Sequence, residues 1–149
     1  MASKSLTFEE KLYIKSIKSL IGKTKNVGKI VTSLKEHGFV QVDSGAYKYV
    51  LRRGDDPYCV KVYRYDTSWK YDSFKVPRHL SKYYLHPIFI NKQFIIQKWA
   101  EKKWNLNKKD VKKIPNDFIK KNYWNYDLHC ANIRIDGNKE VIIDFCHRS

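Results

Sequence analysis

The sequence contains no long hydrophobic run and few cysteines. No apolar stretch approaches the roughly 18 to 20 residues of a membrane-spanning helix, so we expect no membrane segment. The first ten residues end in two glutamates where a secretion signal would be apolar, which predicts an intracellular, cytoplasmic protein. The three cysteines, Cys59, Cys130 and Cys146, are odd in number and widely spaced, which argues against a disulfide scaffold and for a reducing compartment.

Acidic residues are also scarce. The 149 residues include 30 Lys+Arg against 15 Asp+Glu, for a formal net charge of +15 at pH 7. Such a surface attracts polyanions of any kind, so an acidic protein and non-specific nucleic-acid binding both stay open. Only 6 of the 30 basic residues are arginines, which argues against sequence-specific DNA reading, because base edges are read mainly by the planar fork of Arg.

Helical periodicity dominates the first forty residues. Thr7 and Glu10 form a capping-box pattern ahead of apolar residues at helical spacing, which predicts a helix over 8–21. A second helix is predicted over 27–37, between Asn26 and Gly38. With 42% hydrophobic residues the chain can build a folded core, and we interpret residues 1–38 as the helical extension of one compact unit.

After Gly38 the hydrophobic period changes to that of strands. Five segments are rich in β-branched and aromatic residues and are separated by turn residues: 39–42, 47–53, 58–64, 88–90 and 94–96. They predict a five-stranded antiparallel sheet that begins with a three-stranded meander. Pro77 interrupts residues 68–84, where we expect one or two short helices.

The C-terminal third begins polar and ends in a hairpin pattern. Residues 101–113 are lysine-rich and are expected to form a linker with some helix, and a further helix is predicted from Pro115 to about Trp124. Segments 132–135 and 140–145 flank Asp136-Gly137-Asn138, which is a hairpin signal.

Three oxygen-bearing side chains mark the ends of this hairpin. Asp127 precedes it, Asn132 stands at the entry to its first strand, and Asp144 at the exit of its second. This order predicts that the three lie at one end of the hairpin. Carboxylate and amide oxygens, together with substrate phosphates, are ligands that suit Mg²⁺.

This segment resembles the catalytic loop of the protein-kinase-like superfamily, in which an Asn follows the catalytic Asp by five residues and an Asp-Phe pair comes later. The resemblance implies that Asp127 orients or deprotonates an attacking hydroxyl, and that Asn132 and Asp144 hold Mg²⁺ on the phosphates of ATP. The Asp-Leu-His sequence at 127–129 is similar to that of small-molecule kinases and some phage-encoded kinases.

The upstream half resembles the same superfamily. Gly45 stands in the first strand turn, which would cover the phosphates, and Lys61 stands on the third strand, where it would reach the α- and β-phosphates. Strand alternation places Cys59 on the same face as Lys61, toward the adenine in this resemblance. Residues 97–100 resemble the connector that binds adenine. The implied ATP-binding residues are Gly45, Cys59, Lys61, Gln97 and Trp99.

The expected architecture is therefore α+β, a reduced protein-kinase-like fold. It has the helical extension 1–38, an N-lobe over 39–100, and a linker with a minimal catalytic lobe over 101–149. The implied function is ATP- and Mg²⁺-dependent phosphotransfer, with a protein Ser/Thr hydroxyl as the first choice of acceptor. No segment matches the helical lobe that presents protein substrates, so a partner chain or a second copy would complete the site, or the acceptor is small. Such a chain fits a viral or phage genome and would then act in the host cytoplasm.

Two alternatives from other functional classes stay open. The superfamily has three glycines in the loop over the phosphates, and this sequence has one of them, Gly45. The best match for the carboxylate that would pair with Lys61 is Asp72. The weak match for this carboxylate and the missing activation segment favour a pseudokinase-like binding or regulatory module. The lysine-rich stretch 98–121 instead favours a non-specific nucleic-acid-binding protein.

Two further residue sets have competing interpretations. Two histidines and two cysteines near the C-terminus could form a zinc set, although their spacing is not that of a zinc finger: His129, Cys130, Cys146 and His147. A set of aromatic residues is interpreted as core and lobe contacts rather than as a stacking platform for bases: Trp99, Trp104, Tyr123, Trp124 and Tyr126.

Overall fold

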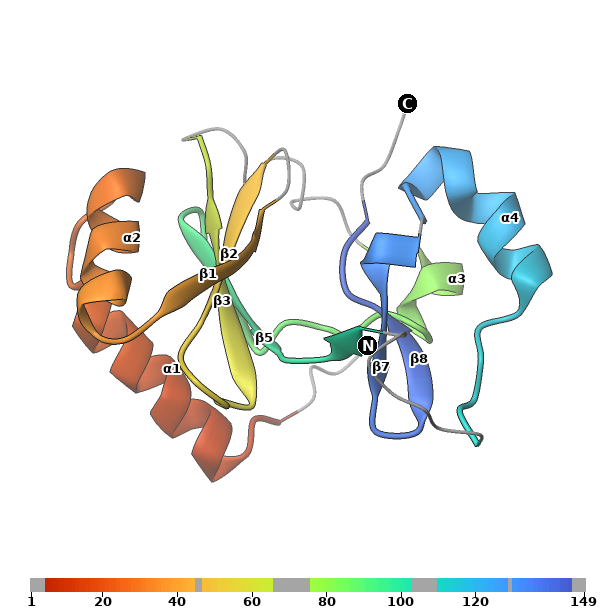
Figure 1. The fold of residues 1–149 in the computed structure, drawn as a ribbon, viewed down its shortest axis with the longest axis horizontal. Coiled ribbons are helices and arrows are strands. Elements are labelled where there is room, and N and C mark those ends of the chain that lie inside the picture. The colour runs from red at the N-terminus through yellow and green to blue at the C-terminus, as the bar shows by residue number, and fades with distance from the viewer. Residues whose placement is uncertain (1–4, 45–46, 66–75, 103–109, 129, 146–149) are drawn as a thin grey trace. The chain divides into compact units, whose positions relative to one another are not determined.

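A computed structural model describes residues 5–44, 47–65, 76–102, 110–128 and 130–145 (Figure 1). Within these residues the fold is α+β, with four α-helices, one five-stranded sheet and one three-stranded sheet. The α+β class is confirmed, whereas the kinase-like lobe organisation stays a prediction. The chain divides into two compact units: unit 1 is Met1–Trp69 with Pro87–Lys98, and unit 2 is Lys70–His86 with Trp99–Ser149.

Unit 1 begins with the two predicted helices, α1 (Phe8–Ile21) and α2 (Val27–Glu36). The capping box of α1 is formed in both directions: the Glu10 N–H donates to the Thr7 hydroxyl oxygen at 3.1 Å, and the Thr7 N–H donates to Glu10 Oε1 at 2.9 Å. The Asn26 side chain caps α2 by accepting the Lys29 N–H at 3.0 Å.

The sheet of unit 1 contains the five predicted strands in the order β1-β2-β3-β5-β4, and all neighbours are antiparallel. These strands are β1 (Val40–Ser44), β2 (Lys48–Arg52), β3 (Tyr58–Tyr63), β4 (Phe89–Ile90) and β5 (Phe94–Lys98). Helices α1 and α2 cover one face of this sheet (Figure 1). The predicted meander and the two added strands are therefore confirmed.

The core of unit 1 lies between these helices and the sheet. Helix side chains such as Ile17 and Leu34 pack with the strand residues Val60 and Val62, and all four are fully buried. Because side chains alternate along a strand, Val60 and Val62 face the helices while Cys59 and Lys61 face the opposite side of the sheet, as the sequence predicts.

Unit 2 combines two helices with a small sheet. Its elements are α3 (Arg78–Ser81), β6 (Glu101–Lys102), α4 (Asn116–Tyr126), a 3₁₀ turn (Cys130–Asn132), β7 (Ile133–Asp136) and β8 (Lys139–Ile142). Strands β7 and β8 form the predicted hairpin, and Gly137 adopts a φ of 64° in its two-residue turn, a region that favours glycine. A second apolar core, built around Leu80, Leu128 and Ile142, holds the helices to the hairpin.

Two sequence-based predictions for unit 2 need correction. Glu101 and Lys102 do not belong to a linker with helix; they form β6, which pairs with Ile135 and Arg134 of β7. Helix α4 continues to Tyr126, two residues beyond the predicted end. Of the segment 68–84, the structure describes 76–84, where α3 is the one helix, and 66–75 lie outside the described residues.

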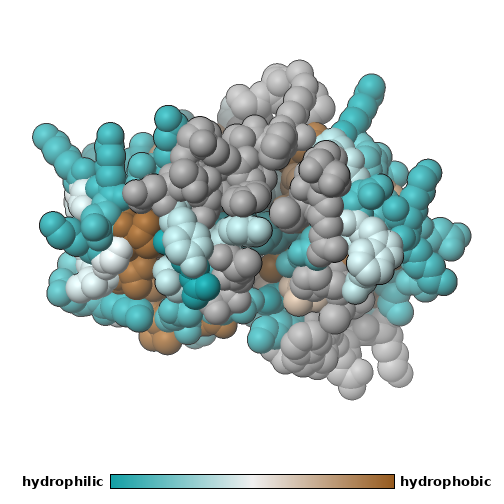
Figure 2. Space-filling model, turned by 90° about the horizontal axis from the view of Figure 1, so that it is seen from above, coloured by the Kyte–Doolittle hydropathy of each residue, from teal (hydrophilic) through white to brown (hydrophobic). Residues whose placement is uncertain are grey.

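The visible surface is largely hydrophilic, as Figure 2 shows by the prevalence of teal over brown. A search of the described helices finds none with both the length and the apolar character needed to cross a bilayer.

Candidate functional site

Asp127 has an unusual backbone conformation at the end of α4. Its φ of 58° and ψ of 41° lie in the left-handed region, and among the described residues it is the one non-glycine residue with a positive φ. Such a conformation carries strain that the surroundings must offset, and strain of this kind gathers at functional sites. The next residue, Leu128, is fully buried in the core of unit 2 and fixes this turn.

Asn132 connects Asp127 to the end of the hairpin. Its side-chain Nδ2 donates a hydrogen bond of 2.8 Å to the backbone carbonyl of Asp127. Its own backbone carbonyl accepts the N–H of Ile143 at 2.9 Å, which brings the residue before Asp144 to the start of β7. The structure thus gathers the three residues Asp127, Asn132 and Asp144 at one end of the hairpin, where the sequence places them.

The carboxylate of Asp144 is oriented by its neighbour. Asp144 Oδ1 accepts the backbone N–H of Phe145 at 3.0 Å. The ring of Phe145 in turn packs edge-on against Tyr84 and Tyr126, with centroids 5.2 and 6.4 Å apart. Ring packing and the hydrogen bond together restrict the rotamers of both residues, so the carboxylate is held in place before any ligand binds.

The donor set at this end of unit 2 fits a hard divalent cation. Because the Asn132 amide nitrogen donates to Asp127, the amide Oδ1 is the atom of that side chain that could ligate a metal. One amide and one carboxylate oxygen suit Mg²⁺, which takes few protein ligands beside phosphates and waters. Across the described residues, no group of three or more His, Cys, Asp or Glu side chains forms a metal site made by such residues alone.

Unit 1 holds three further candidate residues, Cys59, Lys61 and Gln97, on the helix-free face of its sheet. Lys61 is 4% exposed and lies between Val50 of β2 and Ile95 of β5. Cys59 is paired in register with Gln97, and both are buried. A lysine is rarely buried to this extent, because removing an ammonium from water is costly. Lys48 of β2, at 8% exposed, is buried as well, and both residues differ in this from the exposed lysines that prevail in the described part of the chain.

The predicted adenine connector crosses the boundary between the two units, since Gln97 belongs to unit 1 and Trp99 to unit 2. The indole N–H of Trp99 donates to Glu101 Oε1 at 3.2 Å, so the polar edge of this ring faces β6. The structure groups the candidates as Cys59, Lys61 and Gln97 within unit 1, and as Asp127, Asn132 and Asp144 within unit 2.

Several candidates fall outside what the structure describes. Gly45 and Asp72 lie in undescribed segments, so the phosphate-covering turn and the carboxylate partner of Lys61 stay predictions. The alternative zinc set also lies outside the described residues. The structure does not describe His129, Cys146 and His147, nor the side chain of Cys130.

One supporting pair was not predicted. Asn122 is 5% exposed on the inner face of α4, and its Oδ1 accepts the ring Nε2–H of His79 at 2.9 Å. Its Nδ2 donates to the Phe118 carbonyl one turn back at 2.8 Å. This pair ties α4, and hence the turn at Asp127, to α3. Nothing in the sequence around Asn122 distinguishes it from a surface asparagine, because its neighbours include two lysines. Its burial could therefore not be predicted.

Comparison with family models, with curated proteins and with solved structures gives no match.

Proposed function

We propose that this protein is an ATP- and Mg²⁺-dependent phosphotransferase that acts on a hydroxyl group. The observation that carries the proposal is the linked set in unit 2, in which Asn132 hydrogen-bonds the strained residue Asp127 and its backbone holds the segment that presents Asp144. Its support in unit 1 is the buried Lys61 on a strand face that also presents Cys59 and Gln97.

The chemistry assigned to these residues is in-line transfer of the γ-phosphoryl group. The acceptor oxygen forms a bond to the γ-phosphorus while the bond from that phosphorus to the β–γ bridging oxygen breaks, and ADP leaves. The acceptor's proton passes to the carboxylate of Asp127, which also orients the hydroxyl. The ammonium of Lys61 holds the α- and β-phosphates, so the barrier falls through positioning and charge neutralisation.

Asn132 and Asp144 are the residues that would hold Mg²⁺. When bound, the cation neutralises phosphate charge that this protein's side chains alone would leave unbalanced. The hydrogen bonds of Asn132 and Asp144 restrict the rotamers of these two side chains. Their oxygens therefore lose less conformational freedom when the cation binds.

The acceptor is proposed from charge. With a net charge of +15 the protein attracts acidic molecules, so we propose a Ser or Thr hydroxyl in an acidic protein segment as the first acceptor to test. A second copy of the chain or a partner chain would present that segment, and a small acidic alcohol is the alternative.

The test is transfer of label from [γ-³²P]ATP in the presence of Mg²⁺, with ADP formation measured in parallel so that activity is detected whatever the acceptor. We expect both signals from the wild type, and losses of at least about 100-fold in Asp127→Asn and Lys61→Met, because the first removes the base for the acceptor's proton and the second removes the cation that holds the α- and β-phosphates. Asp136→Asn is the matched control, since Asp136 pairs with Lys139 at the hairpin turn, away from the assigned residues.

The outcomes separate the candidate functions. Label that persists in both variants would remove this mechanism. ATP binding without label or ADP would favour the pseudokinase-like regulatory module, which shares the binding residues but not the chemistry.

A further inference from the structure

The outer face of α4 carries two large aromatic side chains in water. Trp124 is 71% exposed and Tyr123 is 43% exposed. The inner face of the helix carries a different set of residues: Asn122, which is buried, and Phe118, Ile119 and Tyr126, which are partly buried and pack on the core of unit 2. The sequence-based interpretation of Tyr123 and Trp124 as core contacts is therefore wrong.

The two rings contact each other rather than the core. Their centroids lie 5.5 Å apart at an interplanar angle of 77°. The edge-to-face contact holds Trp124 beside Tyr123 and leaves broad ring surface in water.

Two lysines lie one helical turn before the exposed indole. Lys120 and Lys121 precede Trp124 by four and three residues, a spacing that places them on the same side of the helix. Both are exposed, and no ion pair in the described part of the chain involves either of them. The outer face thus combines aromatic surface with two lysine ammonium groups, and the exposed carboxylate of Asp117, one turn before the lysines, leaves a net positive charge there.

We propose that the outer face of α4 binds single-stranded nucleic acid, with bases stacked on Trp124 and Tyr123 and phosphates held at Lys120 and Lys121. Aromatic platforms flanked by cations bind single strands in this way, since every base has a π-face and every nucleotide a charge. A duplex fits poorly, because its bases are already stacked on one another. The interaction is independent of the phosphotransfer proposed above.

Other partners fit this face less well. Insertion into a lipid surface needs a broad apolar face along the helix, whereas the exposed residues of α4 include two aromatic side chains among five polar or charged ones: Asn116, Asp117, Lys120, Lys121, Tyr123, Trp124 and Asn125. Protein interfaces are depleted of lysine at their centres, whereas here the lysines adjoin the aromatic pair. An acidic protein is therefore the competing class that the experiment must separate.

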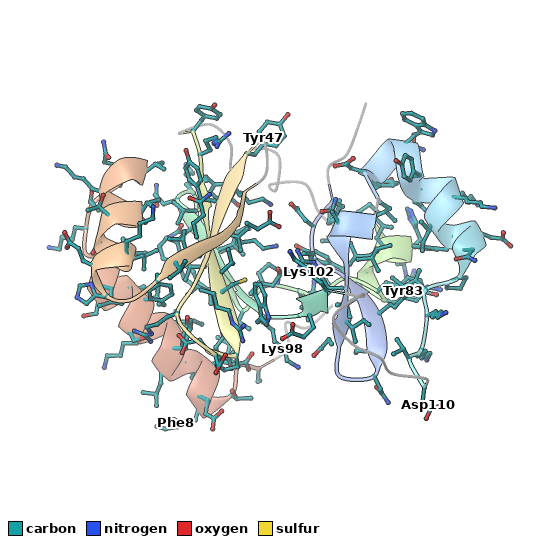
Figure 3. All side chains as sticks on the ribbon, in the orientation of Figure 1. Phe8, Tyr47, Tyr83, Lys98, Lys102 and Asp110 are labelled. Atoms are coloured by element: carbon teal, nitrogen blue, oxygen red, sulfur yellow. The ribbon has the colours of Figure 1, made fainter. Side chains whose placement is uncertain are left out.

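The experiment measures binding of a fluorescein-labelled 15-nucleotide oligothymidylate by anisotropy, without ATP or Mg²⁺, so that its result does not depend on catalysis. We expect Trp124→Ala to weaken binding about 5- to 150-fold, the range found for loss of one stacking ring. Trp124→Phe, which keeps a ring, should retain most of the affinity. Phe8→Ala is the matched control, since Phe8 is an equally exposed aromatic that extends from the start of α1 (Figure 3).

Salt dependence tests the lysines separately. In the double variant Lys120→Gln/Lys121→Gln, the plot of log affinity against log salt concentration should become shallower. The magnitude of its slope should fall by about 1.4, which is about 0.7 for each lost phosphate contact. The charge-matched pair Lys112→Gln/Lys113→Gln, which is exposed outside α4, should leave the slope unchanged. Circular dichroism checks that each variant is folded.

Three results would overturn the proposal. The first is affinity of Trp124→Ala within twofold of the wild type. The second is equal affinity for oligothymidylate and for a 15-base-pair duplex. The third is displacement of the oligonucleotide by poly-glutamate at equal charge concentration, which would assign the face to an acidic protein.

Discussion

The side chain of Asn132 donates a hydrogen bond of 2.8 Å to the backbone carbonyl of Asp127, five residues earlier. One bond therefore connects the proposed metal ligand with the proposed base. Since Asp127 is also held at a φ of 58°, the geometry of the turn depends on this contact as well as on the burial of Leu128. The relationship leads to the first prediction.

Replacing Asn132 should affect both folding and activity. Asn132→Ala removes the hydrogen bond to Asp127, which costs about 1 kcal/mol of unfolding free energy, and it removes a proposed Mg²⁺ ligand. We expect phosphotransfer to fall at least about 100-fold, a loss typical of a missing electrostatic group. Urea denaturation and [γ-³²P]ATP transfer measure the two effects. Asn138→Ala, at an exposed position of the hairpin turn, should change neither, and equal loss in both variants would contradict the assignment.

Replacing Lys61 should separate function from stability. Lys61→Met keeps the length of the side chain but removes a charge that is 4% exposed, so the desolvation cost of the ammonium disappears. Urea denaturation measures the unfolding free energy of the variant in parallel, so that a loss of ATP binding can be separated from a loss of fold. Affinity for ATP, measured by calorimetry, should fall at least about tenfold, as for loss of a charged hydrogen bond. Lys35→Met on α2 serves as the exposed control, and unchanged ATP affinity in Lys61→Met would rule out the phosphate role.

Alkaline pH should destabilise unit 1 through Tyr13. Its hydroxyl donates to Asp56 Oδ2 at 3.3 Å, and burial, reinforced by the negative charge of Asp56, raises the pKa of Tyr13 above its ordinary value of 10.0. The folded state thus holds the phenolic proton more tightly than the unfolded state, so this stability is present below pH 10 and is lost as the pH rises beyond it.

Tyr13→Phe isolates this effect, since it keeps the ring that packs on Tyr58 with centroids 4.7 Å apart. Unfolding free energies from urea titrations between pH 8 and 11 should fall more steeply for the wild type than for the variant above pH 10. Parallel curves would show that Tyr13 does not carry the alkaline dependence.

Two positions of α1 test the placement of the core. Ile17 is fully buried against the sheet, whereas Leu12 of the same helix is 51% exposed. Ile17→Ala should cost about 2 to 5 kcal/mol of unfolding free energy, because it removes buried methyl groups and leaves a cavity. Leu12→Ala should stay within about 0.5 kcal/mol, as for most surface changes. Similar costs at the two positions would mean that α1 packs through another face.

The sequence predicts unit 1 well because its signals are local and agree with one another. The capping box of Thr7 and Glu10 fixes the start of α1, and the switch from helical to strand period after Gly38 separates helices from sheet. Alternation along β3 then assigns Lys61 to the helix-free face without knowledge of any long-range contact.

Unit 2 is less predictable for identifiable physical reasons. Strand β6 has two residues, too few to show a period, and it forms only because β7 offers a partner. The backbone strain at Asp127 depends on tertiary contacts that leave no pattern in sequence. Aromatic residues occur at 123, 124 and 126 of α4, on both its inner and outer faces, so periodicity cannot say which of them is buried.

A crystal structure with Mg²⁺ and a non-hydrolysable ATP analogue would decide whether these residues bind the nucleotide and its metal. The account predicts one cation ligated by Asn132 Oδ1 and a carboxylate oxygen of Asp144, each at about 2.1 Å, with Lys61 Nζ within hydrogen-bond distance of the α- or β-phosphate. A nucleotide bound elsewhere, or a cation that contacts neither Asn132 nor Asp144, would contradict it.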